Sequence, residues 1–307
     1  MELTKSQIKL RKAVTESFAA IEKLGYTVLF VGNYGSHNYN LEVNNSFYQS
    51  DIDTKAIILP TLDELISNRA PVSTTIETKY GQCDIKDIRV FMQTLIKANI
   101  QFLELLRANA VMVNQKYYDD FKWFIEHLEE LIKGSQPQLL KSVYGMSMEK
   151  KKALCHPYPT TKWKIDQWGY DGKQLHHILR LKDFIANYFY NGQNFQDAIR
   201  YNKDSAQYAI LMDAKLNRYS LTQAKEMAEF YCHTIKEWVD ELLLTTSENK
   251  EIKQQYLDKA NEIIKKAVID SVKKEEANEN NRDSWPRRVW KNYFVKFYQR
   301  GARKKTL

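Results

Sequence analysis

Strand-like sequence is confined to the first third of this chain. Short runs of β-branched, aromatic and aliphatic residues occur at residues 26–32, 52–59 and 74–85, whereas from Asp87 onward apolar residues recur at helical spacing. The 307 residues include only ten Gly and six Pro, which is few for a turn-rich β fold. The pattern predicts an α+β protein in which a small mixed sheet with flanking helices is followed by a larger all-helical domain.

The expected elements divide the chain into three parts. Residues 1–110 should form the sheet-containing core, with a first helix over 6–24 that stops at Gly25 and a short helix N-capped by Thr61. Residues 111–281 should form the helical domain, with 273–281 as a solvated connector, and 282–307 a basic, aromatic C-terminal segment. Helices are expected over 88–98, 101–108, 116–133, 138–154, 173–191, 206–216, 221–244 and 251–274.

Charge and cysteine usage indicate the kind of partner and the cellular compartment to expect. The formal net charge is +8 with a pI near 9.1, which favours an anionic partner. The three Cys are scattered without C-x-x-C spacing, so they support neither a disulfide framework nor a zinc site. The start of the chain has no signal-peptide pattern and no apolar run approaches a membrane span, so we expect a cytoplasmic protein without membrane contact.

Two carboxylates are placed to meet at one point. Asp51 and Asp53 flank Ile52 at a predicted strand, so both should project from one face while Ile52 points into the core. Such a pair repels itself unless a cation neutralises it, and Mg²⁺ characteristically takes one or two carboxylates together with substrate phosphates. The plainer alternative is a pair of surface acids at the start of an exposed strand.

A glycine-serine turn precedes the acidic pair. Gly35 and Ser36 follow the apolar strand at 26–32, where glycine lets the backbone approach a ligand and the serine offers a hydroxyl and an amide to a phosphate oxygen. A phosphate donor set facing a metal donor set outlines a nucleotide site. The expected catalytic and metal-binding set is Asp51, Asp53 and a third acid at Asp84, with Mg²⁺ or Mn²⁺ as cofactor. Asp87 is the rival third acid, but helical spacing from Ile88 makes it an N-cap.

These residues carry a resemblance. Gly35-Ser36 followed by Asp51-Ile52-Asp53 resembles the signature of the DNA polymerase β-like nucleotidyltransferase superfamily, which implies a palm-like sheet. More narrowly, Gly35 to Tyr39, Ser50 to Asp53, Asp87 to Phe91 and Phe102 to Leu106 are similar to the predicted nucleotidyltransferases associated with RNA ligases. The resemblance extends from about Gly25 to Leu244. Asn40 stands where that group usually has Gly, and the loop over 40–49 is longer than usual.

The predicted helical half carries a second motif. Asp171-Gly-Lys173 continues to His177 and Arg180, which matches an Asp-x-Lys-x-x-x-His-x-x-Arg stretch of the same group. Lys173, His177 and Arg180 fall at i, i+4 and i+7 and should share one helix face that suits a triphosphate. The alternatives are a solvated basic face for this stripe, and for Glu104 either orientation of one of these cations or pairing with Arg107 or Lys97.

The C-terminal segment interleaves basic and aromatic residues. Its expected phosphate contacts are Arg287, Arg288, Lys291, Arg303, Lys304 and Lys305. The alternative is an amphipathic helix that docks Trp290, Phe294 and Phe297 on the body of the protein.

Together the motifs predict a metal-dependent nucleotidyltransferase that moves a nucleoside monophosphate from an NTP, by expectation ATP, to an acceptor hydroxyl on RNA. Three alternatives stay open: a catalytically inactive nucleotide- or RNA-binding protein of the same fold, a protein-modifying transferase of the AMPylating type, and an architectural helical protein that binds nucleic acid through its tail. Oligomeric state cannot be read from the sequence.

Overall fold

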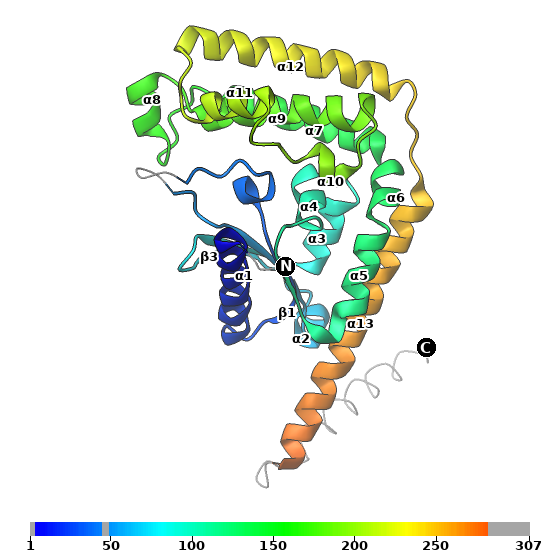
Figure 1. Cartoon of the computed structure of the whole chain (residues 1–307). Coiled ribbons are helices and arrows are strands. Elements are labelled where there is room, and N and C mark those ends of the chain that lie inside the picture. Colours follow the sequence, from blue (N-terminus) through cyan, green and yellow to red (C-terminus); the bar gives the residue numbers. More distant parts are fainter. Residues whose placement is uncertain (1–3, 45–48, 282–307) are drawn as a thin grey trace, which may run out of the picture.

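A five-stranded mixed sheet lies at the centre of the first third of the chain. The structure is a computed structural model that describes residues 4–44 and 49–281 (Figure 1). The strands are β1 (Thr27–Asn33), β2 (Thr54–Leu59), β3 (Ser73–Glu77), β4 (Gln82–Asp87) and β5 (Val111–Val113), in the order β3-β4-β2-β1-β5. β2 and β4 run parallel, and all other neighbours are antiparallel. The mixed sheet followed by helices confirms the predicted α+β class.

Helices cover both faces of the sheet. The amphipathic helix α1 (Lys5–Lys23) packs on one face, where Val14, Phe18 and Ile21 meet Val28 and Val31 of β1. α3 (Ile88–Leu95) and α4 (Ile100–Leu105) lie on the other face, against Phe30 and Ile57. A register shift between Val28 and Phe30 places both Leu29 and Phe30 in this second cluster, as a bulge does.

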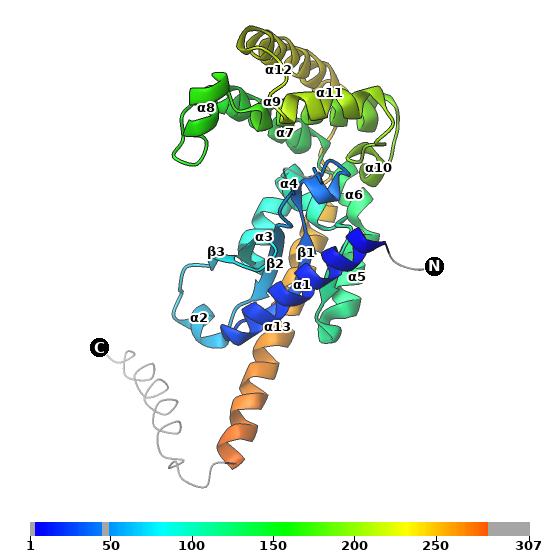
Figure 2. The ribbon, with the colours of Figure 1, turned by 60° about the vertical axis from the view of Figure 1, so that its left-hand side comes forward.

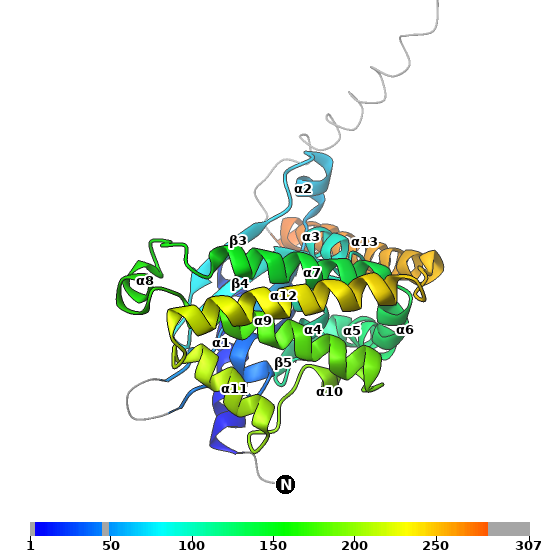
Figure 3. The ribbon, with the colours of Figure 1, turned by 90° about the horizontal axis from the view of Figure 1, so that it is seen from above.

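A layer of long helices lies across one end of the sheet. It contains α7 (Gln136–Ala153), α9 (Gly172–Ile185), α11 (Ala206–Lys215) and α12 (Leu221–Leu243), which run side by side at the top of Figure 1 and in the view from above in Figure 3. Shorter helices complete the chain: η1 (Gly35–Asn38), α2 (Leu62–Ile66), η2 (Gln115–Tyr117), α5 (Tyr118–Glu126), α6 (Leu128–Lys133), α8 (Lys162–Trp168), η3 (Ala186–Tyr190) and α10 (Phe195–Ala198).

The last helix of the described residues returns from the helical layer to the sheet. α13 (Lys250–Asn281) descends beside α5 and α3, as Figures 1 and 2 show. Its residues Tyr256 and Ile263 belong to the same buried cluster as Phe30 on the sheet and Leu179 in the helical layer. The sheet also extends past the boundary expected at residue 110, because β5 lies beyond it. Residues 1–110 and 111–281 therefore share one core.

Three local details differ from the sequence expectations. The single helix expected over 116–133 is divided at His127 into α5 and α6. The expected connector over 273–281 is the end of α13. α9 continues past Ile185 through one π-helical turn, η3.

Within residues 4–44 and 49–281, no helix combines the length and apolarity needed to cross a bilayer.

Candidate active site

A cavity of about 660 Å³ opens between the sheet and the helical layer. Gly35, Ser36, Asp51 and Asp53 line it from the sheet side. Lys173, His177 and Arg180 line it from α9. The fold thus brings together two motifs that are about 120 to 140 residues apart, and of the residues predicted for the nucleotide site only Asp84 lies off the wall. The volume of the cavity is typical of a site for a small-molecule ligand or cofactor.

The glycine-serine turn forms where β1 ends. Gly35 has φ +78°, a left-handed conformation that glycine adopts at little cost, and a side chain there would be strained even though the surrounding space is open. The turn is fastened to the acidic segment, because the amide of Tyr34 donates to the carbonyl of Asp53 at 3.1 Å. Ser36 is half-buried in η1 and faces the cavity.

The acidic pair lies just before β2 and not within it. Ile52 is buried, Asp51 is exposed and Asp53 is half-buried, so the expected alternation holds although the strand begins only at Thr54. The hairpin turn at Gly81 supports this segment. A Cβ at Gly81 would lie 2.8 Å from the carbonyl oxygen of Ile52, so only glycine lets the turn approach.

Further hydrogen bonds link the hairpin to the acidic segment. The amide of Ile52 donates to the carbonyl of Tyr80 at 2.9 Å, and that of Gln82 donates to Asp53 Oδ1 at 3.2 Å. Among the described residues, neither Asp51 nor Asp53 forms an ion pair with a basic side chain. The carboxylates therefore keep lone pairs for a cation.

Asp84 lies on β4 beside the pair, but its carboxylate is engaged. Lys55 Nζ and Lys86 Nζ each lie 2.9 Å from one of its oxygens. Burial raises the pKa of the Tyr34 hydroxyl, and the negative charges of Asp53 and Asp84 raise it further, which places both acids near this ring. Within residues 4–44 and 49–281, no group of three His, Cys, Asp or Glu side chains is arranged to hold a metal ion.

The rival acid is a helix cap. Asp87 is buried at the start of α3, where its Oδ1 accepts from the amide of Arg89 at 2.8 Å. The Arg89 guanidinium also pairs with Asp87 Oδ2 at 2.6 Å. This confirms the predicted cap.

α9 presents its cationic stripe to the cavity. Asp171 N-caps the helix, and its pKa lies below the usual range because hydrogen bonds from Lys164 and Gln174 outweigh the opposing effect of burial. Gly172 allows the N-terminus of α9 to abut α11, since a Cβ there would lie 2.1 Å from the carbonyl oxygen of Ala214. The Asp-Gly-Lys start of the motif therefore places Lys173.

Arg180 is fixed deep in the cavity. Its Nη2 donates to Glu104 Oε1 at 2.9 Å, its guanidinium lies 3.4 Å from the centre of the Tyr39 ring, and the Tyr39 hydroxyl donates to Glu104 Oε2. Glu104 thus orients one of the cations of the stripe, which was one of the two roles considered for it. His177 lies next to Arg180, and burial and that charge lower its pKa well below the ordinary value, so its imidazole is neutral.

The cavity is also lined by two lysines that belong to no sequence motif. Lys215, at the end of α11, donates to the carbonyl of Leu41 at 2.6 Å. Burial and the charge of Lys173 lower its pKa to about 8. Lys164, on α8, pairs with Asp171 at 2.8 Å. Each is a single lysine with no regular spacing to the others, so only the fold shows that they belong to the site.

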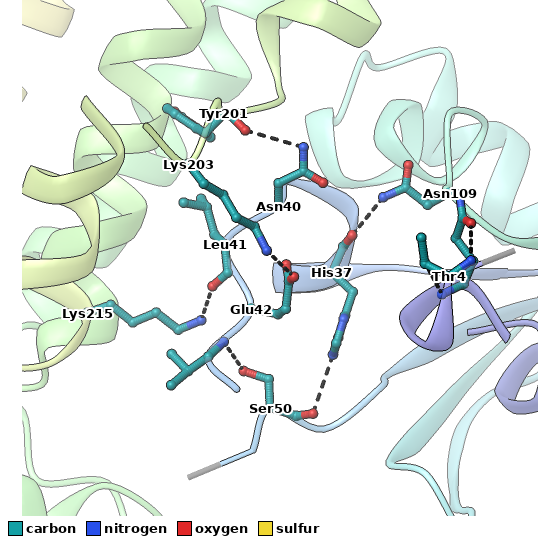
Figure 4. Close-up of polar contacts among 12 residues, drawn as sticks. Thr4, His37, Asn40, Leu41, Glu42, Ser50, Asn109, Tyr201, Lys203 and Lys215 are labelled. Atoms are coloured by element: carbon teal, nitrogen blue, oxygen red, sulfur yellow. Dashed lines mark hydrogen bonds and ion pairs between the residues drawn. The ribbon is translucent and has the colours of Figure 1, made fainter. Parts of the chain in front are cut away.

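The loop after the turn is held by the helical layer, as Figure 4 shows. Asn40 Nδ2 donates to the carbonyl of Tyr201 at 3.3 Å, and Lys203 pairs with Glu42 at 2.6 Å. Asn40 has φ +63°, a left-handed conformation that asparagine tolerates better than most residues. Asparagine is therefore compatible with this turn.

The expected nucleic-acid contacts Arg287, Arg288, Lys291, Arg303, Lys304 and Lys305 lie outside the residues that the structure describes.

Comparisons with known proteins add little. No family model matches the chain, and neither does any curated protein. Among solved structures, the chain is similar to a nucleotidyltransferase-like protein from Exiguobacterium sibiricum, with 12% sequence identity and a TM-score of 0.29 over 80% of this chain and 78% of that chain. The assignment of a function therefore rests on the cavity and its residues.

Proposed function

We propose that this protein is a metal-dependent nucleotidyltransferase that moves a nucleoside monophosphate from an NTP to an acceptor hydroxyl on RNA. The observation that carries the proposal is the cavity in which Asp51 and Asp53 face the cations of α9 beside the Gly35-Ser36 turn. Carboxylates opposite a cationic wall form a site for a divalent ion and a polyphosphate together.

The residues fit the cation that this chemistry needs. Asp51 and Asp53 would hold Mg²⁺ or Mn²⁺, and the bound ion would neutralise charge at the α-phosphate and lower the pKa of the attacking hydroxyl. Asp84 would become a third ligand only if the cation displaced a lysine, because Lys55 and Lys86 occupy both of its oxygens.

The remaining groups position the triphosphate. Ser36 and the amides of its turn bind phosphate oxygens, while Lys173 and Arg180 add positive charge that the fold has already oriented. A bond forms between the acceptor oxygen and the α-phosphorus, the bond from that phosphorus to the bridging oxygen of the β-phosphate breaks, and pyrophosphate leaves. The acceptor proton would pass to Asp84 once a lysine has released one of its oxygens.

RNA is the acceptor that the charge of the chain favours. A net charge of +8 attracts polyanions, and the C-terminal segment of the chain is dense in basic and aromatic residues. A protein acceptor, as in AMPylation, would give label in the protein fraction of the assay described below. Cytoplasmic location follows from the same proposal, since NTP and RNA are abundant there.

The test is transfer of label from each α-labelled NTP, with Mg²⁺ or Mn²⁺, to total RNA and to total protein. Asp51→Asn and Asp53→Asn should abolish transfer and leave the unfolding transition unchanged within about 1 kcal/mol, because both groups lie outside the core. Asp63→Asn, at an exposed position on α2, is the matched control. Transfer at the wild-type rate by the double variant would refute the proposal.

A second candidate is a nucleotide- or RNA-binding protein without turnover. The pairing of Asp84 with two lysines favours it, since a site that never recruits a third acid would keep that arrangement. It predicts Mg²⁺-dependent NTP binding that Asp51→Asn removes, with no release of pyrophosphate under any acceptor condition. An architectural protein would bind RNA in a salt-sensitive manner and show no NTP affinity.

A further inference from the structure

Two tryptophans that line the cavity belong to α8, a helix whose contact with the core is made by Trp168 alone. α8 contains no buried residue, and its Trp163 is 56% exposed. Trp163 and Trp168 both line the cavity, with ring centroids 5.6 Å apart at an interplanar angle of 61°. Figures 1 and 2 show α8 at one end of the helical layer. An exposed tryptophan ring that lines a cavity is available to contact a ligand there.

α8 is held in a fixed place beside α9. Lys164 Nζ lies 2.8 Å from the Asp171 carboxylate that caps α9, and Gly169 ends α8 in the left-handed conformation against Leu221. Trp168 packs on the edge of the core. Trp163 therefore lies against Trp168, a residue that the core holds in place.

The groups along the cavity follow the order of the parts of a nucleotide. Arg180, with 10% of its side chain exposed, marks the deep end of the stripe, and the exposed Lys173 marks the outer end. Seven residues of helix separate them, or about 10 Å, which is the scale of a triphosphate. Lys164 of α8 pairs with Asp171 at the N-terminal end of α9, and α8 also carries the two rings. A triphosphate on the stripe leaves its base at α8.

The hydrogen-bonding side chains at this end of the cavity each have a partner in the fold. Asn217, which lines the cavity near α8, donates to the carbonyl of Tyr170 at 2.9 Å and accepts from the amide of Gly172 at 3.3 Å. The Lys164 ammonium is paired with Asp171. Recognition at this end falls to the aromatic faces, which favour large rings and do not distinguish adenine from guanine.

We infer that Trp163 and Trp168 bind the nucleobase of the incoming NTP by stacking, so that the protein selects purine over pyrimidine nucleotides but not ATP over GTP. The inference deepens the proposed function and rests on it, since it assumes that the triphosphate lies on the α9 stripe.

The experiment measures the Kd of Mg-ATP, Mg-GTP, Mg-CTP and Mg-tripolyphosphate by calorimetry with the full chain. Trp163→Ala should weaken ATP and GTP by about tenfold or more and CTP by less, with tripolyphosphate unchanged. Trp163→Phe should restore most of the loss. Phe230→Ala, which removes a 63% exposed ring on α12, is the control and should change nothing.

The outcomes separate this inference from the proposed function. Equal loss of tripolyphosphate and ATP in Trp163→Ala would mean a change in the phosphate site and would overturn stacking. Unchanged NTP binding with a raised KM for RNA would assign the rings to the acceptor and also overturn it. If the wild-type protein binds tripolyphosphate and all NTPs equally, stacking fails while the phosphate site stands. If it binds none of them, the proposed function fails and this inference with it.

Discussion

At the scale of single residues, the site depends on which carboxylate completes it. Asp84 and Asp87 are three residues apart on one strand, yet the first meets two lysines and the second caps α3. Asp84→Asn should lower kcat for transfer by about 100-fold or more with NTP affinity within about threefold, because a group that acts only in the transition state does not contribute to ground-state binding.

Asp87→Asn provides the matched comparison. Asparagine still caps a helix, so the loss is that of the ion pair with Arg89, about 1 to 2 kcal/mol of unfolding free energy with kcat unchanged. Steady-state kinetics and urea unfolding measure both variants. Loss of turnover in Asp87→Asn with full turnover in Asp84→Asn would reverse the assignment.

Lys215 should make phosphate binding dependent on pH. Its pKa of about 8 means that it loses its charge between pH 7.5 and 9, so the affinity for Mg-ATP should fall over that interval. Lys215→Met should bind more weakly at pH 7.5 and show little further change to pH 9. Binding of the anion favours the charged lysine, so the midpoint of the change will lie above 8.

The same group has the opposite effect on stability. A lysine whose folded pKa lies below its ordinary value of 10.5 penalises the fold while it is protonated, and that penalty fades as the pH rises from about 8 toward 10.5. Thermal unfolding of wild type and Lys215→Met over pH 7 to 10 measures this. A constant difference between the two proteins over that range would contradict the buried charge.

The acids and the cationic stripe that line the cavity could be singled out in the sequence because each lies in a short, regular pattern. Asp51 and Asp53 have the period of a strand, and Lys173, His177 and Arg180 have the period of a helix. Lys215 could not be found in this way, because its partner Leu41 is 174 residues away. The state of Asp84 was equally hidden, since Lys55 is brought to it only by the parallel pairing of β2 and β4.

At the scale of elements, the contact between α9 and α11 sets the position of Lys173. Gly172→Ala would place a methyl group against the carbonyl of Ala214, so the helices must separate and stability should fall by about 2 to 4 kcal/mol. Gly145→Ala is the control, because this exposed glycine in α7 has nothing within 4 Å of a new Cβ and alanine favours the helix by about 1 kcal/mol.

Chemical denaturation and NTP titration distinguish the two glycine variants. Gly172→Ala should also weaken NTP binding, since the first turn of α9 carries Lys173. An equal gain in stability from both substitutions would show that the two helices do not approach as closely as described.

Elements with strong periodicity were predictable, and those defined by packing were not. α3, α9 and α12 follow from their apolar spacing. α8 follows the Pro157 and Pro159 region, is seven residues long and has no buried face, so no apolar period marks it. The break at His127 and the π-helical turn at Ala186–Tyr190 contain no Gly or Pro that would mark them in the sequence.

At the scale of the whole molecule, a buried ion pair joins the sheet region to the helical layer. Glu104 lies on α4 and Arg180 on α9, and both are nearly inaccessible. Removing one partner strands the other, so Glu104→Gln and Arg180→Met should each destabilise the protein by about 3 to 5 kcal/mol. The double variant Glu104→Leu with Arg180→Met should cost less than the sum of the single variants, because no charge remains buried without a partner.

Urea unfolding of the three variants tests the coupling. The wild-type transition should be single, since one apolar cluster extends from Phe30 through Leu179 to Ile263. Two separated transitions, or strictly additive losses, would show that the sheet and the helical layer are energetically independent.

The contacts that hold the loop after β1, which we call its clasp, also constrain how the sequence can evolve. Asn40 and Tyr201, whose contact helps to shape that loop, are encoded 161 positions apart. A recombination event that exchanged the second half of the gene for that of a distant relative would separate the loop from its clasp. Inheritance of the two halves as a matched pair is therefore the expected pattern, with compensating changes arising in step at Glu42 and Lys203, whose side chains form an ion pair between the same two segments.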